Sequence, residues 1–276
     1  MAKTVDIAIL SIEGTNCDEE LASGFQRLGA HAEVVDVQQF RAPAREAGYR
    51  RRLSDYQVVM FPGGFSGGDY VRAGAIMAAR VRSTIGKDLR DFLRTSGNVV
   101  GGICNGFQVL VELGLLPGRD DGVLTAPQAV LAPNASARFE CRPTYCRWDG
   151  GNFRPFQGVD RGRVFQFPSA HGEGRLVLSG ARGATLRDLE NNGQILFRWT
   201  DPEGRRAGYP WNPNGSEGDV AGITNREGNV FGLMPHPERA VDRVQYPDWT
   251  RSGPTPAEGD GRFFLGSILR YAARYA

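Results

Sequence analysis

The chain of 276 residues is poor in lysine and in long apolar runs. Lys3 and Lys87 are the two lysines among 33 basic residues, and these are balanced by 31 acidic residues to a net charge of +2. So balanced a charge does not indicate a nucleic-acid partner. No apolar run approaches the length of a membrane span, and the N-terminus lacks a signal-peptide core. We therefore expect a cytoplasmic protein with no membrane contact.

The cysteines show no spacing that predicts a bound metal or a disulfide framework. There are four of them, with no C-x-x-C pair: Cys17, Cys104, Cys141 and Cys146. This pattern favours free thiols in a reducing compartment. We therefore expect no metal site in this chain.

The chain is long enough, and with 41% hydrophobic residues apolar enough, to bury a full core. In its first half, runs rich in Val, Ile and Leu alternate with helix-like runs. The expected strands cover 5–10, 32–37, 57–61 and 98–103, and the expected helices cover 19–28, 73–95 (with a break at Gly86) and 107–113. This alternation predicts an α/β sheet whose parallel strands are joined by right-handed crossovers.

Beyond residue 118 the pattern changes to shorter strand-like runs. These runs predict antiparallel strands added to the parallel sheet, and they cover 138–148, 163–167, 176–179 and 194–200. The glycine-flanked polar residues 167–174 are expected to form a loop that faces a site. A strand over 230–234 and an amphipathic helix over 261–275 follow, and we expect residues 1–276 to form a single domain.

A glycine-flanked cysteine stands where an expected strand meets an expected helix. The segment is Gly102-Ile103-Cys104-Asn105-Gly106. It is the cysteine counterpart of the G-x-S-x-G turn, which lifts a nucleophile above a sheet. At a helix start, free N–H groups and the helix dipole favour a thiolate. Because a cysteine is more often a small buried apolar residue, this interpretation depends on a second motif.

A glycine-rich turn over 62–69 follows the expected strand 57–61. In open α/β sheets ligands bind beyond the carboxyl ends of the strands, and Gly63 and Gly64 can present bare N–H groups to an anion there. The turn lacks the Gly-Lys-Ser/Thr ending of a P-loop. We therefore favour an oxyanion hole beside Cys104 over a phosphate-binding loop, and a plain turn remains the third alternative.

The histidine best placed to serve Cys104 is His236, in the segment Pro-His-Pro-Glu. A residue before proline is extended, and side chains two apart on an extended segment share a side, so His236 and Glu238 are expected to face one site. This predicts Cys104 as nucleophile, His236 as general base and Glu238 as the carboxylate that orients the imidazole. His171 is the rival base, and His31 is expected to be an ordinary surface residue.

These motifs together resemble class I glutamine amidotransferases, and more narrowly the glutaminase subunits of phosphoribosylformylglycinamidine synthase. The elements Cys-x-Gly-x-Gln and His-x-Glu mark the broad superfamily. The narrower resemblance rests on segments spread over almost the whole chain, at 14–18, 62–66, 68–75, 102–108, 114–118, 170–174, 212–216 and 235–240. It implies a flavodoxin-like fold with a mostly parallel central sheet, flanking helices and an added antiparallel region.

The resemblance implies hydrolysis of glutamine to glutamate and ammonia. The ammonia would go to a large ATP-dependent synthetase subunit that converts formylglycinamide ribonucleotide to formylglycinamidine ribonucleotide in de novo purine biosynthesis, and a small third subunit would be allowed. No cofactor is implied in this chain, since ATP and Mg²⁺ would be used by the partner. The N–H of Asn105 and one from Gly63–Gly64 would hold the oxyanion, and Gln108 would contact glutamine. His171 would line the site without an assigned role.

Three other classes of protein share parts of this pattern. A different cysteine hydrolase on the same scaffold would act on another amide, and a phosphate-binding module would use the Gly63–Gly64 turn. A non-catalytic interaction subunit would keep the fold alone, but the intact Cys104, His236 and Glu238 argue against it. Labelling of the thiol by a glutamine analogue separates these alternatives.

Overall fold

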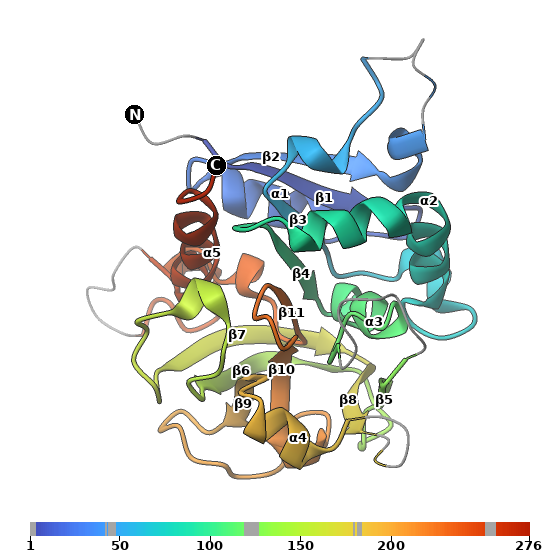
Figure 1. The fold of residues 1–276 in the computed structure, drawn as a ribbon. Coiled ribbons are helices and arrows are strands. Elements are labelled where there is room, and N and C mark those ends of the chain that lie inside the picture. Colours follow the sequence, from blue (N-terminus) through green and yellow to red (C-terminus); the bar gives the residue numbers. More distant parts are fainter. Residues whose placement is uncertain are drawn as a thin grey trace.

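The computed structural model describes residues 4–41, 43, 48–118, 127–178, 180, 184–251 and 258–276. Its largest feature is a nine-stranded sheet that is parallel in one half and antiparallel in the other (Figure 1). Five neighbouring strands form the parallel half, in the order β2 (His31–Asp36), β1 (Asp6–Ser11), β3 (Val58–Phe61), β4 (Val99–Ile103) and β11 (Val230–Leu233). Four strands then continue the sheet in antiparallel fashion, in the order β10 (Val220–Thr224), β9 (Ile195–Thr200), β6 (Glu140–Trp148) and β7 (Val164–His171). A separate pair, which we count with this antiparallel half, joins β5 (Ala129–Pro133) to β8 (Glu173–Leu178).

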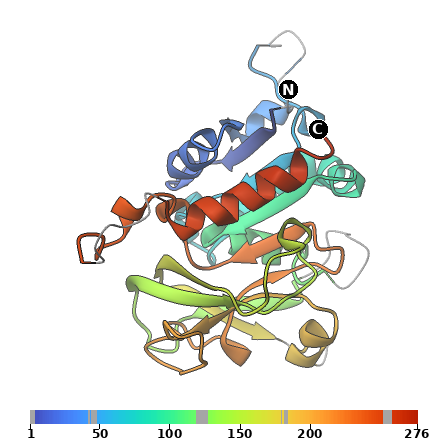
Figure 2. The ribbon, with the colours of Figure 1, turned by 90° about the vertical axis from the view of Figure 1, so that its left-hand side faces the viewer.

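The order of the parallel strands decides which face each helix covers. From β1 the chain moves outward to β2, whereas from β3 it moves inward to β4. Right-handed crossovers therefore place α1 (Asp18–Gln26) and α2 (Ala75–Arg94) on opposite faces. Helix α5 (Asp260–Ala272) packs beside α1, and α3 (Asn105–Glu112) packs beside α2 (Figure 1 and Figure 2). This is the flavodoxin-like arrangement, in which ligands bind beyond the carboxyl ends of the strands.

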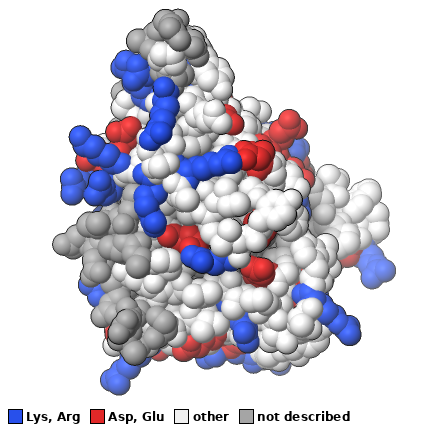
Figure 3. Space-filling model, turned by 90° about the vertical axis from the view of Figure 1, so that its right-hand side faces the viewer, with Lys and Arg blue, Asp and Glu red and all other residues white. Residues whose placement is uncertain are grey.

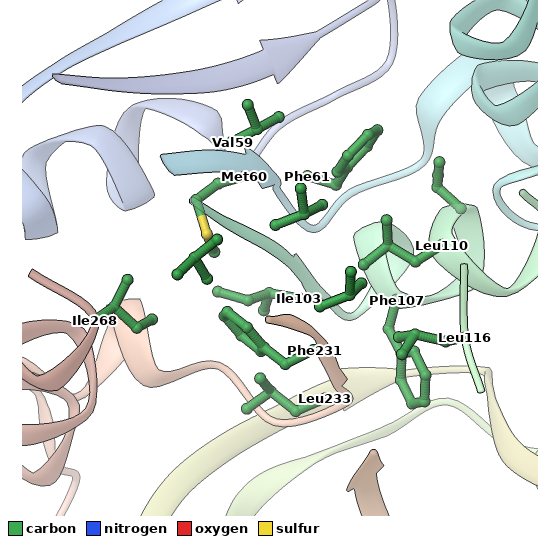
Figure 4. Close-up of a cluster of buried hydrophobic side chains, with 14 of the residues drawn as sticks. Val59, Met60, Phe61, Ile103, Phe107, Leu110, Leu116, Phe231, Leu233 and Ile268 are labelled. Carbon is green, nitrogen blue, oxygen red and sulfur yellow. The ribbon is translucent and has the colours of Figure 1, made fainter. Parts of the chain in front are cut away.

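Close packing in the parallel half holds α3 against the end of the sheet (Figure 4). Phe107 of α3 covers the backbone of β11 at Gly232, where an added Cβ would lie 2.1 Å from the ring. At Gly106 an added Cβ would lie 1.9 Å from the carbonyl oxygen of Phe61, so only glycine fits. The first turn of α3, with Cys104 before it, is therefore fixed at the carboxyl edge of the sheet.

The antiparallel half has an aromatic core of its own. The ring centroids of Phe165 and Phe197 are 5.3 Å apart, and those of Phe156 and Phe264 are 5.5 Å apart. Each ring is buried, and burying such a side chain contributes about 1.5–3 kcal/mol. Phe264 lies on α5 and also contacts Phe231 of β11, so the helix joins the two halves.

Most expected elements are confirmed, including the parallel sheet and its antiparallel extension. Helix α2 is not broken at Gly86 as expected, because that glycine is buried within the continuous helix. Strands β5 and β10 and the short helix α4 (Leu186–Asn191) were not expected. The expected strand over 176–179 lies partly outside the described residues. Among the described helices, none is long and apolar enough to cross a membrane.

The expectation of a loop over 167–174 is wrong. Strand β7 continues to His171, and β8 begins at Glu173, so the segment is two strands joined by a tight turn. Ser169 and His171 are buried on the same side as Phe165, which extends the alternation beyond the apolar residues. The alternation was missed because Ser169 and His171 are polar. Their hydrogen-bond partners, Thr144 and Asn134, come from other segments of the chain.

Candidate active site

Cys104 occupies the sharp turn between β4 and α3. Its backbone has φ 52° and ψ −109°, a conformation that residues other than glycine rarely adopt. Its N–H donates to the carbonyl of Leu233 in β11 at 2.8 Å, which holds the turn against the sheet edge. The thiol is buried, with Sγ 3.7 Å from the carbonyl oxygen of Ala170 in β7. The predicted strand-turn-helix is confirmed, and it has the geometry of a nucleophile elbow.

His236 and Glu238 follow β11 and form a direct contact. The Nδ1 atom of His236 lies 2.6 Å from Oε1 of Glu238, and both side chains are buried. His236 is extended as expected, but residues Pro237–Arg239 form a 3-10 turn rather than continuing the extension. Pro237 begins this turn, because proline is readily accommodated in the first turn of a helix. The turn places the carboxylate of Glu238 beside the imidazole of His236.

The surroundings of His236 keep its imidazole charged. Burial lowers the pKa of His236, but the carboxylate of Glu238 and the sulfur of Cys104 together outweigh burial and raise it from 6.5 to about 10. The buried Nε2 has no hydrogen-bond partner of normal geometry among the described residues, so it is available to the neighbouring thiol. An imidazolium at this position can give its proton to a leaving group.

The site residues converge at Gly63. An added Cβ there would lie 2.8 Å from Cε1 of His236, 3.1 Å from Sγ of Cys17 and 3.4 Å from Cβ of Cys104. These neighbours come from three separate segments of the chain, which the fold brings to one point. Glycine at this position therefore leaves the room that the imidazole occupies.

The two predicted oxyanion donors lie on well-held turns. No described residue accepts a hydrogen bond from the N–H of Asn105 or of Gly64. The side-chain oxygen of Asn105 accepts from the N–H of Ser66 at 3.2 Å and from its hydroxyl at 2.5 Å. Gly64 has φ 132° and packs against Asn16. The oxyanion hole itself remains a prediction.

A cavity of about 320 Å³ opens over Cys104, and this volume is enough for a small ligand. It is lined by predicted residues from three segments, namely Gly64, Cys104, Gln108 and His236. The amide of Gln108 is held on both sides, since Nε2 donates to the carbonyl of Glu173 at 2.5 Å and Oε1 accepts from Asn105 at 2.9 Å. Its contact with glutamine stays a prediction. A larger hollow, of about 590 Å³, includes Gln57 and Asn98 in its lining and contains none of the predicted site residues.

Cys17 and Arg239 belong to the site but were not predicted as site residues. The Nη2 atom of Arg239 donates to Sγ of Cys17 at 3.2 Å, and both residues line the cavity. Burial, followed by the charge of Glu238, raises the pKa of Cys17 to about 12, so this side chain stays a neutral thiol. The loop motif around Cys17 was visible in the sequence, but nothing local placed it beside His236.

Among the described residues, one group of three side chains could offer ligand atoms to a metal ion. Ligand atoms of Cys17, His236 and Glu238 lie within 4.8 Å of one another. However, His236 and Glu238 already share a hydrogen bond, and the guanidinium of Arg239 lies against Cys17, where it opposes a cation. The set fits a hydrogen-bonded catalytic pair better than a metal centre.

The three histidines have different surroundings. His31 is exposed and pairs with Asp6 at 2.7 Å, as expected of a surface residue. His171 is buried in the wall of the cavity, and its Nδ1 faces Asn134 rather than a carboxylate. Burial, followed by the charge of His236, lowers the pKa of His171 to about 4. The carboxylate contact expected of the general base is therefore found at His236.

Comparison with known proteins gives these features a family. The sequence matches the CobB/CobQ-like glutamine amidotransferase domain over residues 4–266. It is 46% identical over 270 residues to the phosphoribosylformylglycinamidine synthase subunit PurQ of Archaeoglobus fulgidus, covering 97% of each chain. To the subunit PurQ of Dehalococcoides mccartyi it is 38% identical over 271 residues, covering 97% of this chain and 98% of that protein. The solved structure of PurLQS from Thermotoga maritima matches over 99% of both chains, with a TM-score of 0.69 and 27% identity. The chain therefore belongs to the glutamine amidotransferase family, among the PurQ subunits of phosphoribosylformylglycinamidine synthase.

Proposed function

We propose that this chain is a glutaminase subunit whose catalytic triad is Cys104, His236 and Glu238. It hydrolyses glutamine and supplies the ammonia to an ATP-dependent synthetase, which converts formylglycinamide ribonucleotide to formylglycinamidine ribonucleotide in de novo purine biosynthesis. The observation that carries this proposal is the convergence of Cys104 and His236 on Gly63 beside the cavity. Residues 1–276 act as one domain, supported by a single sheet that runs from β2 to β7.

The first half of the reaction forms a thioester. The thiolate of Cys104 attacks the side-chain amide carbon of glutamine, the C–N bond breaks, and His236 gives its proton to the leaving nitrogen. Ammonia departs and a glutamyl group remains on the sulfur. Because its pKa is raised, His236 holds this proton until the C–N bond breaks and the leaving nitrogen accepts it.

The second half releases glutamate. The imidazole, now neutral, takes a proton from a water molecule whose oxygen attacks the thioester carbon. The C–S bond breaks, and the thiolate and the imidazolium are restored. Throughout, the carboxylate of Glu238 accepts a hydrogen bond from Nδ1 and so keeps Nε2 as the reactive nitrogen.

Both halves pass through a tetrahedral intermediate with a negatively charged oxygen. We assign its stabilisation to the N–H of Asn105 and to an N–H of the Gly63–Gly64 turn, and losing one such donor costs roughly 10²–10³ in rate. Gln108 contacts glutamine from the cavity wall. The donors lie at the carboxyl ends of β3 and β4, where the Cys104 turn places the sulfur as well.

The synthetase docks over the mouth of this cavity. Phe65 and Phe139 line the cavity and are 51% and 55% exposed, while Tyr70 and Val71 nearby in the chain are 89% and 71% exposed. Figure 3 views the molecule from the side toward which β1 points in Figure 1, and it shows uncharged surface between scattered charged groups. Exposed aromatic residues of this kind are typical of binding surfaces. ATP and Mg²⁺ bind to the synthetase, and the complex allows for a small third subunit.

Labelling with a diazo-oxo-norleucine, a glutamine-like electrophile, tests the proposal directly. We expect an adduct on Cys104 that glutamine suppresses, that peptide mass spectrometry locates, and that is absent in Cys104→Ala. Cys141→Ser changes an exposed thiol and serves as the control that still labels. Absence of an adduct, with and without the synthetase, would overturn the function. We expect the chain alone to hydrolyse glutamine weakly and the synthetase to accelerate it.

A further inference from the structure

One buried nitrogen of the cavity lacks a partner. His171 is 3% exposed and lines the same cavity as Cys104 and His236. Its Nδ1 lies 3.2 Å from Oδ1 of Asn134, whereas its fully buried Nε2 has no hydrogen-bond partner among the described residues. Because an unpaired buried polar atom costs free energy, such an atom in a cavity wall is a place where a ligand completes the bonding.

The hydrogen bonds of Asn134 decide which nitrogen of His171 carries the proton. The amide nitrogen of Asn134 donates to the carbonyls of Arg138 at 2.9 Å and of His171 at 2.8 Å. Its Oδ1 accepts from the N–H of Gly174 at 3.1 Å, so this atom is the oxygen. Nδ1 of His171 must therefore donate to it. With the proton on Nδ1, Nε2 presents a lone pair and can only accept a hydrogen bond.

The rest of the turn supports this arrangement. The carbonyl of Gly174 accepts hydrogen bonds from the side-chain amide of Asn214 at 2.8 Å and from the hydroxyl of Ser216 at 3.3 Å. The motifs Ala-His-Gly-Glu-Gly and Asn-Pro-Asn-Gly-Ser thus meet around one turn. An added Cβ at Gly174 would lie 2.7 Å from Nδ1 of His171, so glycine leaves room for the ring. This network places His171 in one position and one tautomer.

The proposed chemistry determines how the side-chain amide of glutamine is oriented in the cavity. Its amide oxygen must lie at the N–H groups of Asn105 and Gly64, in the parallel half. The amide nitrogen then points to the opposite wall, where the carbonyl of Ala170 lies 3.7 Å from Sγ of Cys104 and where His171, with its unpaired Nε2, lines the cavity. Both are acceptors, and a primary amide offers two N–H donors, whereas the carboxylate of glutamate offers none.

We propose that Nε2 of His171 accepts a hydrogen bond from the side-chain amide of glutamine and thereby makes the site select glutamine over glutamate. This inference rests on the proposed glutaminase function. A glutamate carboxylate would set an oxygen lone pair against the lone pair of Nε2, which weakens its binding and helps the product to leave. Sites that match a donor to a buried acceptor reject analogues that lack the donor.

A matched pair of substitutions tests the role of this nitrogen. His171→Asn keeps a group near Nδ1 and loses the acceptor at Nε2, whereas His171→Gln reaches the Nε2 position with an amide oxygen. In the complex with the synthetase, we would measure kcat/KM for glutamine and the inhibition constant of glutamate. For His171→Asn we expect kcat/KM to fall about 10- to 100-fold while glutamate inhibits as well as before or better. His171→Gln should recover most of this discrimination, and His31→Asn should leave it unchanged.

The outcomes separate this inference from the function on which it rests. If the wild-type complex releases no glutamate from glutamine, the proposed function fails and the inference fails with it. If the wild type is active but His171→Asn, with an unchanged melting temperature, shows the same discrimination, the inference alone is wrong. Equal weakening of glutamine and glutamate in both variants would show that His171 is only structural.

Discussion

The two halves of the sheet contribute opposite chemistry to one cavity. The parallel half supplies Cys104 and His236, and the imidazole of His236 is kept charged by Glu238. The antiparallel half supplies His171, which contacts Asn134 and is kept neutral by burial and by the nearby charge of His236. The same type of side chain thus has its pKa raised in one wall of the cavity and lowered in the other.

This difference shows how burial and neighbouring charges determine whether a buried histidine is charged. A carboxylate at Nδ1 stabilises the imidazolium, whereas an amide oxygen there accepts a hydrogen bond without supplying a full charge. The charged histidine can donate a proton to a leaving group, whereas the neutral one can only accept a hydrogen bond at Nε2. The parallel half is therefore equipped to break the amide bond and the antiparallel half to recognise it.

The largest expected effect comes from removing the charge behind His236. Glu238→Gln keeps the shape of the side chain but lowers the pKa of His236, so kcat should fall roughly 10²–10⁴-fold. Steady-state glutamate release in the complex measures this loss. Glu20→Gln is the control, because Glu20 pairs with Arg239 at a half-exposed position and does not contact His236. Equal losses in both variants would mean that Glu238 acts only through general electrostatics.

The convergence at Gly63 gives the next largest effect. In Gly63→Ala the new methyl group would lie 2.8 Å from Cε1 of His236 and displace the imidazole. This displacement of the general base should lower kcat roughly 100-fold. Gly29→Ala is the matched control, because Gly29 has φ +88° with no atom near the added Cβ. It should lower the free energy of unfolding by about 1 kcal/mol without changing kcat. A fully active Gly63→Ala enzyme would contradict the crowding at this point.

The two histidines should also shift stability in opposite pH ranges. For His236, the pKa is about 10 in the folded protein and 6.5 unfolded, so its stabilisation is complete below pH 6.5 and is lost as pH rises toward 10. For His171, with a folded pKa of about 4, stabilisation is complete above pH 6.5 and is lost as pH falls toward 4.

Urea unfolding at a series of pH values measures these contributions, each of which changes stability by at most about 1.4 kcal/mol per pH unit. Below pH 6.5, His171→Asn should lose less stability than the wild type as the pH falls. Above pH 6.5, Glu238→Gln should lose less as the pH rises. Parallel curves for wild type and variants would show that neither histidine is perturbed in this way.

The smallest expected effect concerns Tyr70, an exposed residue that follows the cavity-lining Asp69 in the sequence. Tyr70→Ser should weaken binding of the synthetase about tenfold and leave the melting temperature unchanged, because the side chain is 89% exposed. Titration calorimetry measures the affinity. Val244→Ser changes an exposed apolar residue that, unlike Tyr70, has no cavity-lining neighbour in the sequence, and it serves as the control. The same affinity for all three proteins would place the synthetase elsewhere.

How far the sequence predicted the site depended on whether the partners of a residue are local. The Cys104 turn was predictable because the glycines, the strand and the helix are all adjacent to it. The contact of His236 with Glu238 was also predictable, although a tight turn and not an extended segment produces it. Strand β7 beyond Phe167 was mistaken for a loop, because its polar residues are satisfied by distant segments.

By itself, the sequence determined the order of most elements, the parallel and antiparallel regions, the nucleophile turn and the family. These follow from hydrophobic period, glycine position and motif spacing, which act over a few residues. Only the tertiary structure decided that Cys17 and Arg239 join the site, and that His171 is a neutral acceptor held by Asn134. The physical reason is that burial and the charge of neighbours determine protonation, and both arise from residues that the fold brings together from distant parts of the chain.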